Sequence, residues 1–381
     1  MSSKHYHYII TGAGCAGLSL LMRMMEDPFF FNKSILVIDQ STKQTNDRTW
    51  CFWEQKPGLF EPIVHHRWNT MQFHSTDFSS NLNLGHYQYK MIQGLDFYQY
   101  VLNKTTQFSN IEFCYERVAS IHTENNQAFV HLENKVVSAD FVFNSIPFQP
   151  INLKKYQFLQ HFTGWVIETD KACFNPSEAI FMDFRISQKN GTSFMYVLPV
   201  SEKKALIEYT LFTPTLLPKE AYESELKAYI GQQLQISNYT ITHEEIGVIP
   251  MTNQPFELQK GRMINIGIEG GQAKGSSGFA FQFIQKRTAA IIKGLKHNQQ
   301  QFASISMHQR KGQFYDSVLL NVLHHKKRNG NQIFSAIFKS NQPETVLRFL
   351  DNESSLLDDL KIMSSVPTHI FLPAAIQELL H

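Results

Sequence analysis

The chain has 381 residues, of which 35 are Lys or Arg and 33 are Asp or Glu, so its formal net charge is only +2. This balance argues against nucleic acid as a partner, and the length predicts two or three domains. Charged residues make up 18% of the chain and aromatic residues 13%, which excludes disordered, collagen-like and coiled-coil classes and predicts apolar, aromatic surface for a ligand.

Residues 1–150 predict a Rossmann-like nucleotide-binding domain with inserted segments at 60–95. Residues 6–11 (YHYIIT) form an apolar run typical of a buried parallel strand, and residues 18–25 predict the helix that follows. Residues 34–39 (SILVID) predict the second strand, so one strand–helix–strand unit opens the chain.

A Gly-x-Gly-x-x-Gly motif joins the first strand to its helix. We expect Gly12 to permit a tight turn, Gly14 to let a pyrophosphate approach the backbone, and Gly17 to let helix and strand pack closely. The free N–H groups of the helix would face the phosphates. Asp39, with the adjacent Gln40, ends the second strand and is expected to contact the ribose.

The pattern of apolar and polar residues changes twice in the rest of the chain. Residues 151–255 predict an antiparallel sheet that binds the substrate, because apolar and polar residues alternate in three segments, 179–185, 192–198 and 205–212. Residues 256–300 predict a returning strand at 263–268 and a helix at 279–293. Residues 301–381 are expected to be helical, with an apolar stripe along 314–323 that resumes at 334–338.

The returning strand is followed by a second glycine cluster with Glu269, Gly275 and Gly278. The first motif alone fits NAD or FAD. A returning strand whose acid meets a ribityl chain, and whose helix points at a flavin, favours FAD; a plain strand–helix turn is the alternative. The predicted fold is therefore mixed α/β, with an FAD-binding domain, an antiparallel substrate sheet and a helical C-terminal region.

Four segments resemble the lycopene cyclase family, in the family's order along nearly the whole chain: residues 46–54 (NDRTWCFWE), 181–185 (FMDFR), 206–210 (LIEYT) and 275–279 (GSSGF). The resemblance implies a bacterial lycopene β-cyclase that closes β-ionone rings at the ends of lycopene, giving γ-carotene and β-carotene. It also implies FAD in its reduced form, NAD(P)H as reductant, and no net redox change. Plant members carry two adjacent Glu where this chain has Glu208 and Tyr209, so the second carboxylate of that pair has no counterpart at position 209.

Ring closure begins with protonation of an alkene, a very weak base, so it needs a carboxyl kept protonated in a dry pocket. Glu208 is our candidate acid, because it alternates with apolar residues on one strand face; a solvated sheet surface is the alternative. Asp183 forms either an ion pair with Arg185 or part of the pocket. Glu54 is either a second carboxyl near the flavin or the start of a loop. Arg48 is expected to contact FAD.

No long apolar run, signal peptide or cysteine pairing pattern is present, which predicts a cytoplasmic protein. No ligand spacing for a metal is present either. We expect a peripheral position on the inner membrane face, docked through the C-terminal stripe and the basic run at 326–328, because lycopene and related carotenoids are apolar. A flavin monooxygenase or polyprenyl reductase, and a non-catalytic prenyl-lipid carrier, remain alternatives.

Overall fold

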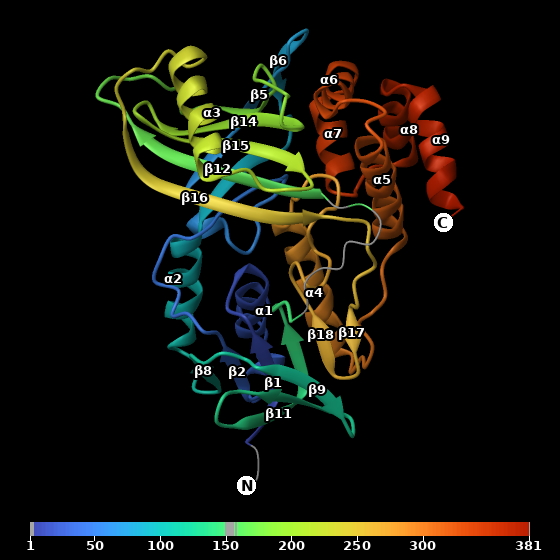
Figure 1. Cartoon of the computed structure of the whole chain (residues 1–381). Helices are drawn as coiled ribbons and strands as arrows, with labels where there is room; N and C mark the ends of the chain where they lie inside the picture. Colours follow the sequence, from blue (N-terminus) through green and yellow to red (C-terminus); the bar gives the residue numbers. More distant parts are fainter. Residues whose placement is uncertain (1–3, 149–155, 157, 381) are drawn as a thin grey trace.

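The computed structural model describes residues 4–148, 156 and 158–380. Two large sheets lie at opposite ends of the molecule in Figure 1, and the C-terminal helices flank the upper sheet. The mixed α/β architecture expected from the sequence is confirmed. All four cysteines are free thiols.

The sheet that carries the N-terminus is the nucleotide-binding type. Its strands run in the order β17-β18-β11-β1-β2-β8, and β1 is parallel to both of its neighbours. The returning strand β18 pairs in parallel with β11, as the sequence predicts. The bounds are β1 His5–Thr11, β2 Ile35–Ile38, β8 Ile111–Cys114, β11 Val136–Asn144, β17 Gln259–Lys260 and β18 Met263–Asn265, with the hairpin β9 Ser120–Glu124 and β10 Gln127–His131 at one side.

Two helices cover this sheet and meet each other. Helix α1 (Cys15–Met25) is apolar almost throughout, and α4 (Phe281–Lys296) contributes Ile284, Ile291 and Leu295 to the same core. The polar link between them runs from the Arg23 Nε to the Thr288 hydroxyl at 3.0 Å. The segment after the returning strand is thereby held against the start of the chain.

The second sheet has seven strands in the order β16-β12-β15-β14-β13-β5-β6. It is antiparallel except where β13 runs parallel to β5, a strand from the inserted segment of the first domain. The bounds are β5 Thr70–His74, β6 Ser79–Asn83, β12 Phe158–Glu168, β13 Glu178–Asp183, β14 Thr192–Ser201, β15 Lys204–Thr213 and β16 Thr240–Met251. One face is covered by α3 (Lys219–Gln232), a helix that our prediction of a pure sheet at 151–255 omitted.

A small sheet connects the two cores. It consists of β3 (Thr49–Glu54), β7 (Gln88–Gln93) and β4 (His66–Trp68), and α2 (Gly94–Thr105) follows β7 directly. Phe52 of β3 packs into the nucleotide-domain core, while the next residue, Trp53, packs under the seven-stranded sheet. Because successive side chains of a strand point to opposite faces, β3 contributes to both cores and connects them.

Five helices complete the chain, and their apolar stripe is not where we expected it. Val318, Val322 and Phe334 lie in the core against the seven-stranded sheet, so the prediction that this stripe forms the docking face was wrong. The helices are α5 Met307–His324, α6 Gly330–Ser340, α7 Pro343–Leu350, α8 Leu356–Ser365 and α9 Thr368–Leu379. Ser355 begins α8 through a capping box, in which its hydroxyl accepts from the Asp358 N–H.

Candidate functional site

A row of residues crosses the seven-stranded sheet on the face opposite α3. Tyr196 of β14 lies directly opposite Glu208 of β15, Glu208 lies opposite Gly164 of β12, and Gly164 lies opposite Glu245 of β16. Directly opposed residues in a sheet point to the same face. Two carboxyl side chains and a tyrosine therefore line one surface, with a glycine between the carboxyls.

Alternation along β15 explains why Glu208 is in this row. Leu206 and Phe212 pack on this face, whereas Ile207 and Tyr209 pack against α3. Glu208 is half-buried among them, and its Oε1 accepts from the Thr210 hydroxyl at 2.6 Å. Position 209 faces away, so a second Glu there would have stood on the other side of the sheet.

The surroundings of Glu208 favour its protonated form. Burial raises the pKa of Glu208 from 4.5 to about 8, the Thr210 hydrogen bond opposes that shift, and the charge of Glu245 adds to it. Cys51 and Tyr89 lie close by on the small sheet, and burial raises the pKa of both, so they are neutral around Glu208. This is the environment that a proton donor needs at neutral pH.

Glu245 is the carboxyl that sequence reasoning missed. It is buried, its Oε1 accepts from the Thr49 backbone N–H at 2.9 Å, and burial raises its pKa while the Thr49 hydrogen bond and the Arg48 charge lower it. Its neighbour in the chain, Glu244, is exposed on the opposite face and pairs with Lys219 at 2.9 Å. Only the register between β12 and β16 identifies Glu245 as the inward residue of the two.

Aromatic side chains bring the four segments that resemble the family into contact beside this row. The Trp53 ring lies 4.7 Å from Phe279 and 6.2 Å from Phe181, edge to face in both cases. Phe181 in turn lies 5.8 Å from Tyr196, which is opposite Glu208. Segments that are more than 200 residues apart in the chain thus share one aromatic cluster.

Asp183 is not part of the row. A register shift in β13 turns its carboxylate to the α3 side, where it is fully buried and accepts from the Tyr229 hydroxyl at 2.7 Å. Arg185, just beyond the end of β13, binds both carboxylate oxygens at 2.9 and 2.6 Å. Burial alone would raise the pKa of Asp183, but these partners lower it. The residue forms the ion pair that we considered as one of two interpretations.

Glu54 is likewise engaged in an ion pair. The Lys90 ammonium is almost fully buried, lies 2.9 Å from the Glu54 Oε1, and also pairs with Glu61. The amide of Gln282 on α4 donates to the Glu54 Oε2 at 3.3 Å. Glu54 therefore links the small sheet to α4 and serves as a counter-ion.

The first glycine motif has the geometry that a dinucleotide requires. Gly12 has φ +96°, and a Cβ on Gly17 would lie 2.0 Å from the Gly12 carbonyl oxygen. Among the described residues, no atom lies within 4 Å of a Cβ built on Gly14, the residue that precedes α1. Asp39 holds the loop, because its Oδ2 accepts from the Ala13 N–H at 2.7 Å.

The second glycine cluster lies between α1 and the seven-stranded sheet. A Cβ on Gly267 would approach that of Ala16 to 3.1 Å, and Gly278, at φ +69°, lies under Gln160 of β12. Within the described part of the chain, the buried Gln160 Oε1 and Ser277 Oγ have no hydrogen-bond partner. Glycines that let a ligand approach the backbone, together with buried polar atoms that lack a hydrogen-bond partner, fit an extended cofactor that reaches from Gly14 toward Glu208.

The remaining predicted cofactor residues differ in their exposure and contacts. Arg48 is exposed and its guanidinium donates to the Asp47 carbonyl at 2.7 Å. Glu269 is half-buried in the loop after β18, and burial raises its pKa. Gly275 allows a close approach to the Thr252 carbonyl, since a Cβ there would be 2.7 Å from its oxygen. Gln40 is exposed beside Asp39.

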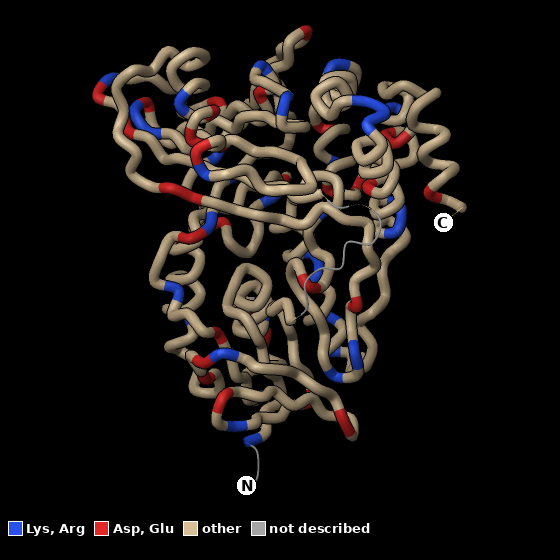
Figure 2. Tube along the Cα trace, in the orientation of Figure 1, with Lys and Arg blue, Asp and Glu red and all other residues tan. Residues whose placement is uncertain are grey.

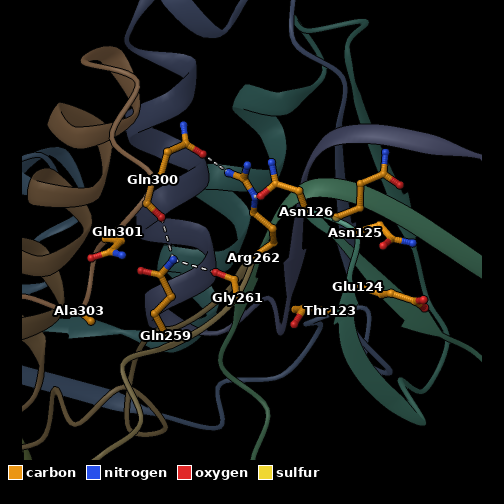
Figure 3. A pocket seen from close by; sticks show the side chains of 11 residues that line it. Thr123, Glu124, Asn125, Asn126, Gln259, Gly261, Arg262, Gln300, Gln301 and Ala303 are labelled. Carbon is orange, nitrogen blue, oxygen red and sulfur yellow. Dashed lines mark hydrogen bonds between the residues drawn. The ribbon is translucent and has the colours of Figure 1, made fainter.

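One cavity, of about 590 Å³, is lined by none of these groups (Figure 3). It is lined mainly by amide and other uncharged side chains of the β9–β10 turn and the β17–β18 hairpin. The Arg262 Nε donates to the Asn126 Oδ1 at 2.8 Å and the Gln259 amide to the Gln300 carbonyl at 2.9 Å. The lining also includes Glu124 and Arg262, and none of the predicted site residues is part of it.

Comparison with known proteins adds the family. A family model described as lycopene cyclase protein matches residues 8–375. A lycopene beta-cyclase from Pantoea ananas is 30% identical over 261 residues, which is 65% of this chain and 63% of that relative, so less than two thirds of its length is matched.

Solved structures show the fold alone, because their sequence identities are low. A flavoprotein/dehydrogenase from Cytophaga hutchinsonii aligns over 99% of both chains with a TM-score of 0.66 and 8% identity. A probable FAD-dependent monooxygenase from Pseudomonas aeruginosa aligns over 88% of this chain and 100% of its own, with 0.61 and 10%. A geranylgeranyl bacteriochlorophyll reductase-like protein from Thermoplasma acidophilum gives 0.59 and 11%, over 99% and 96%.

Proposed function

Because this chain belongs to the lycopene cyclase family, we propose that it is an FAD-dependent lycopene β-cyclase. It closes the acyclic ψ-ends of lycopene to β-ionone rings, giving γ-carotene and β-carotene. The observation that carries the proposal is Glu208, a carboxyl with a pKa of about 8 on a sheet face where apolar and aromatic side chains pack beside it. The substrate class agrees with that face, since a polyene offers no group that needs a polar partner.

The chain's own residues account for the proton steps. The Glu208 carboxyl donates its proton to the terminal double bond, and the electron pair of that bond forms the new C–H bond. The resulting tertiary cation is attacked by the neighbouring double bond, which closes the ring and leaves a cation on a ring carbon. The Glu208 carboxylate then takes a proton from the adjacent ring carbon, so the C–H electron pair forms the ring double bond and the acid is regenerated. Tyr196 and Tyr89 present rings beside Glu208, and aromatic faces stabilise cations.

The glycine loops would hold the cofactor along the path described above. Gly12, Gly14 and Gly17 with Asp39 would hold the dinucleotide part, and Glu269, Gly275 and Gly278 would hold the flavin part. Reduced FAD, regenerated by NAD(P)H, would supply negative charge next to the cationic intermediate without net oxidation. Arg48 and Gln40 would contact the phosphate or ribose side.

Expression in a lycopene-accumulating host tests the proposal. We expect red lycopene to be replaced by γ-carotene and β-carotene on pigment chromatography, and the purified protein to carry a flavin spectrum. Hydroxylated or saturated products would instead indicate a monooxygenase or a polyprenyl reductase of the same fold. Unchanged lycopene bound to the protein would indicate a carrier.

The membrane partner is proposed from the exposed side chains of α8 and α9. Leu356, Leu357, Leu360 and Met363 face outward on α8, and Leu372, Ile376, Leu379 and Leu380 face outward at the end of the chain, each between 41% and 79% exposed. The acids of α8 point inward, where Asp358 pairs with Arg348 and Asp359 with Lys311. Within the described chain, no helix is both long and apolar enough to span a bilayer.

Figure 2 shows how few charges the end of the chain carries, and α9 contains Glu378 as its single Asp, Glu, Lys or Arg. Exposed apolar side chains on two consecutive helices are typical of an interfacial binding surface. We therefore place the protein on the inner face of the cytoplasmic membrane, with α8 and α9 among the lipids from which the carotenoid enters.

A further inference from the structure

The register of three strands places two acids on either side of one glycine. Gly164 of β12 is the direct partner of Glu208 on one side and of Glu245 on the other. Opposed Cα atoms in neighbouring antiparallel strands are about 5 Å apart, so the backbones of the two acids are separated by about 10 Å. Both side chains leave the sheet on the same face.

Gly164 leaves the space between the acids free of any β12 side chain. A Cβ built there would lie 3.0 Å from the Leu206 Cδ1 and 3.6 Å from both the Cβ and the Cγ of Glu208. These distances show that the Glu208 side chain packs against the glycine, while its Oε1 stays bonded to Thr210 on its own strand. Any larger residue at 164 would stand between the two carboxyls.

The two carboxyls have different partners and therefore different preferred charges. Glu245 accepts from the Thr49 backbone N–H at 2.9 Å and lies near the Arg48 guanidinium, both of which favour its ionised form. Among the described residues, Glu208 accepts a hydrogen bond from the Thr210 hydroxyl, at 2.6 Å. When two acids influence each other by charge, the one with fewer charge-stabilising partners keeps its proton to higher pH.

We propose that Glu245 is a positioning residue for ring closure, which holds Glu208 in its protonated form from across Gly164. The inference rests on the proposed function and adds to it a second carboxylate, which comes from β16 and not from the position next to Glu208. The other ionisable groups that face Glu208 are Cys51 of β3, Tyr89 of β7 and Tyr196 of β14, all neutral at pH 7. Beyond Glu245 stand Arg48 and His243.

The test is the pH profile of ring closure in Glu245→Gln. Loss of the negative charge makes Glu208 easier to ionise, so the alkaline limb should move down by about one pH unit. The rate relative to wild type should be nearly unchanged at about pH 6 and reduced about eight-fold at about pH 8.5, as follows from the protonated fractions of Glu208. Glu244→Gln is the matched control, since it makes the same chemical change one residue away on the opposite face.

A second readout needs no substrate. The infrared carboxyl band that Glu208→Gln removes reports the titration of Glu208, and its midpoint should fall in Glu245→Gln and stay in Glu244→Gln. Glu245→Asp keeps the charge and should keep most of the wild-type profile, and it supplies the test if the Gln variant does not fold. An unmoved limb and midpoint, or equal shifts in the Gln and Asp variants, would overturn the proposal. Absence of any ring closure by the wild type would instead refute the proposed function, while the infrared result would still stand.

Discussion

Glu208 is the proposed proton donor of the reaction. Its pKa of about 8 lies above the ordinary value of 4.5, so the folded protein holds the proton through neutral pH. A donor acts only when protonated, and we expect kcat to fall as the pH rises through about 8. The sign for stability is the same, because a raised pKa stabilises the fold fully below pH 4.5 and this contribution is lost as the pH passes 8. Rate and unfolding midpoints measured from pH 6 to 9 check both.

Glu208→Gln tests the role of the acidic proton while leaving the fold intact. The amide keeps the shape but has no acidic proton, and general acid catalysis is worth about 10²- to 10⁴-fold. The variant should remain yellow with bound flavin and leave lycopene unchanged on chromatography. Retention of more than about a tenth of the rate would show that another group donates the proton.

Asp183→Asn should lower the stability of the protein and leave the activity of the folded molecules intact. It weakens the contacts of a buried carboxylate with Arg185 and Tyr229 on the α3 face, so we expect a loss of about 1–3 kcal/mol, reduced because Arg185 is partly exposed. Ring closure per folded molecule should persist. Chemical denaturation and turnover measured on one preparation distinguish the two effects, and a flavin-loaded, stable, inactive Asp183→Asn would contradict this assignment.

Sequence reasoning proposed Glu208 and left out Glu245 for a physical reason. The alternation of residues 205–212 is local, so one strand is enough to place Glu208 between apolar neighbours. Glu244 and Glu245 are adjacent acids in β16, and which of them points inward depends on the pairing with Gly164, about 80 residues earlier. Asp183 was ambiguous for the same reason, since a bulge in β13 reverses the face that alternation predicts.

The first helix and its glycine loop offer a prediction at the scale of an element. A side chain on Gly14 meets no described atom within 4 Å, whereas one on Gly17 meets the Gly12 carbonyl at 2.0 Å. Gly14→Val should therefore fold and lack flavin, because the side chain occupies the space for the phosphates. Gly17→Val should lose stability as well as flavin. Flavin absorbance and thermal unfolding check the pair, and a normal flavin content in Gly14→Val would refute the phosphate site.

Helices and strands whose apolar residues recur at a regular spacing were predictable from the sequence. The elements against which they pack were not. The strand–glycine–helix unit and the returning strand β18 follow from local patterns. Helix α3 escaped prediction because its apolar residues are few and its role is to cover one face of the sheet. The stripe along α5 was recognised as apolar, but the sequence does not say whether such a stripe meets lipid or core, and here it meets the seven-stranded sheet.

The arrangement of the whole molecule explains why the four family-like segments are far apart in the chain. One comes from the small sheet, two from the seven-stranded sheet and one from the loop before α4, and they meet at Trp53, Phe181 and Phe279. None of the domains contains the site alone. The C-terminal helices buttress the sheet from the other side of this cluster, since Phe338 lies 6.1 Å from Phe181.

Helices α8 and α9 are also the proposed site of membrane docking. Leu372 and Ile376 are 55% and 50% exposed on α9, one turn apart, and the outward face of α8 adds one cation, Lys361. Insertion of apolar side chains dominates such a surface, so vesicle binding should persist at high salt, unlike binding through a basic run. Leu372→Ser/Ile376→Ser should weaken it about ten-fold or more.

Ile241→Ser/Val248→Ser is the control, because it removes two apolar side chains of similar exposure, 42% and 45%, from the edge strand β16. The α9 variant should also close rings slowly on lycopene in vesicles and normally on lycopene in detergent, since only delivery from the bilayer depends on docking. Flotation with vesicles and the two turnover assays decide the matter. Equal vesicle binding by both double variants would place the docking surface elsewhere and leave the exposed face of α8 and α9 to another partner.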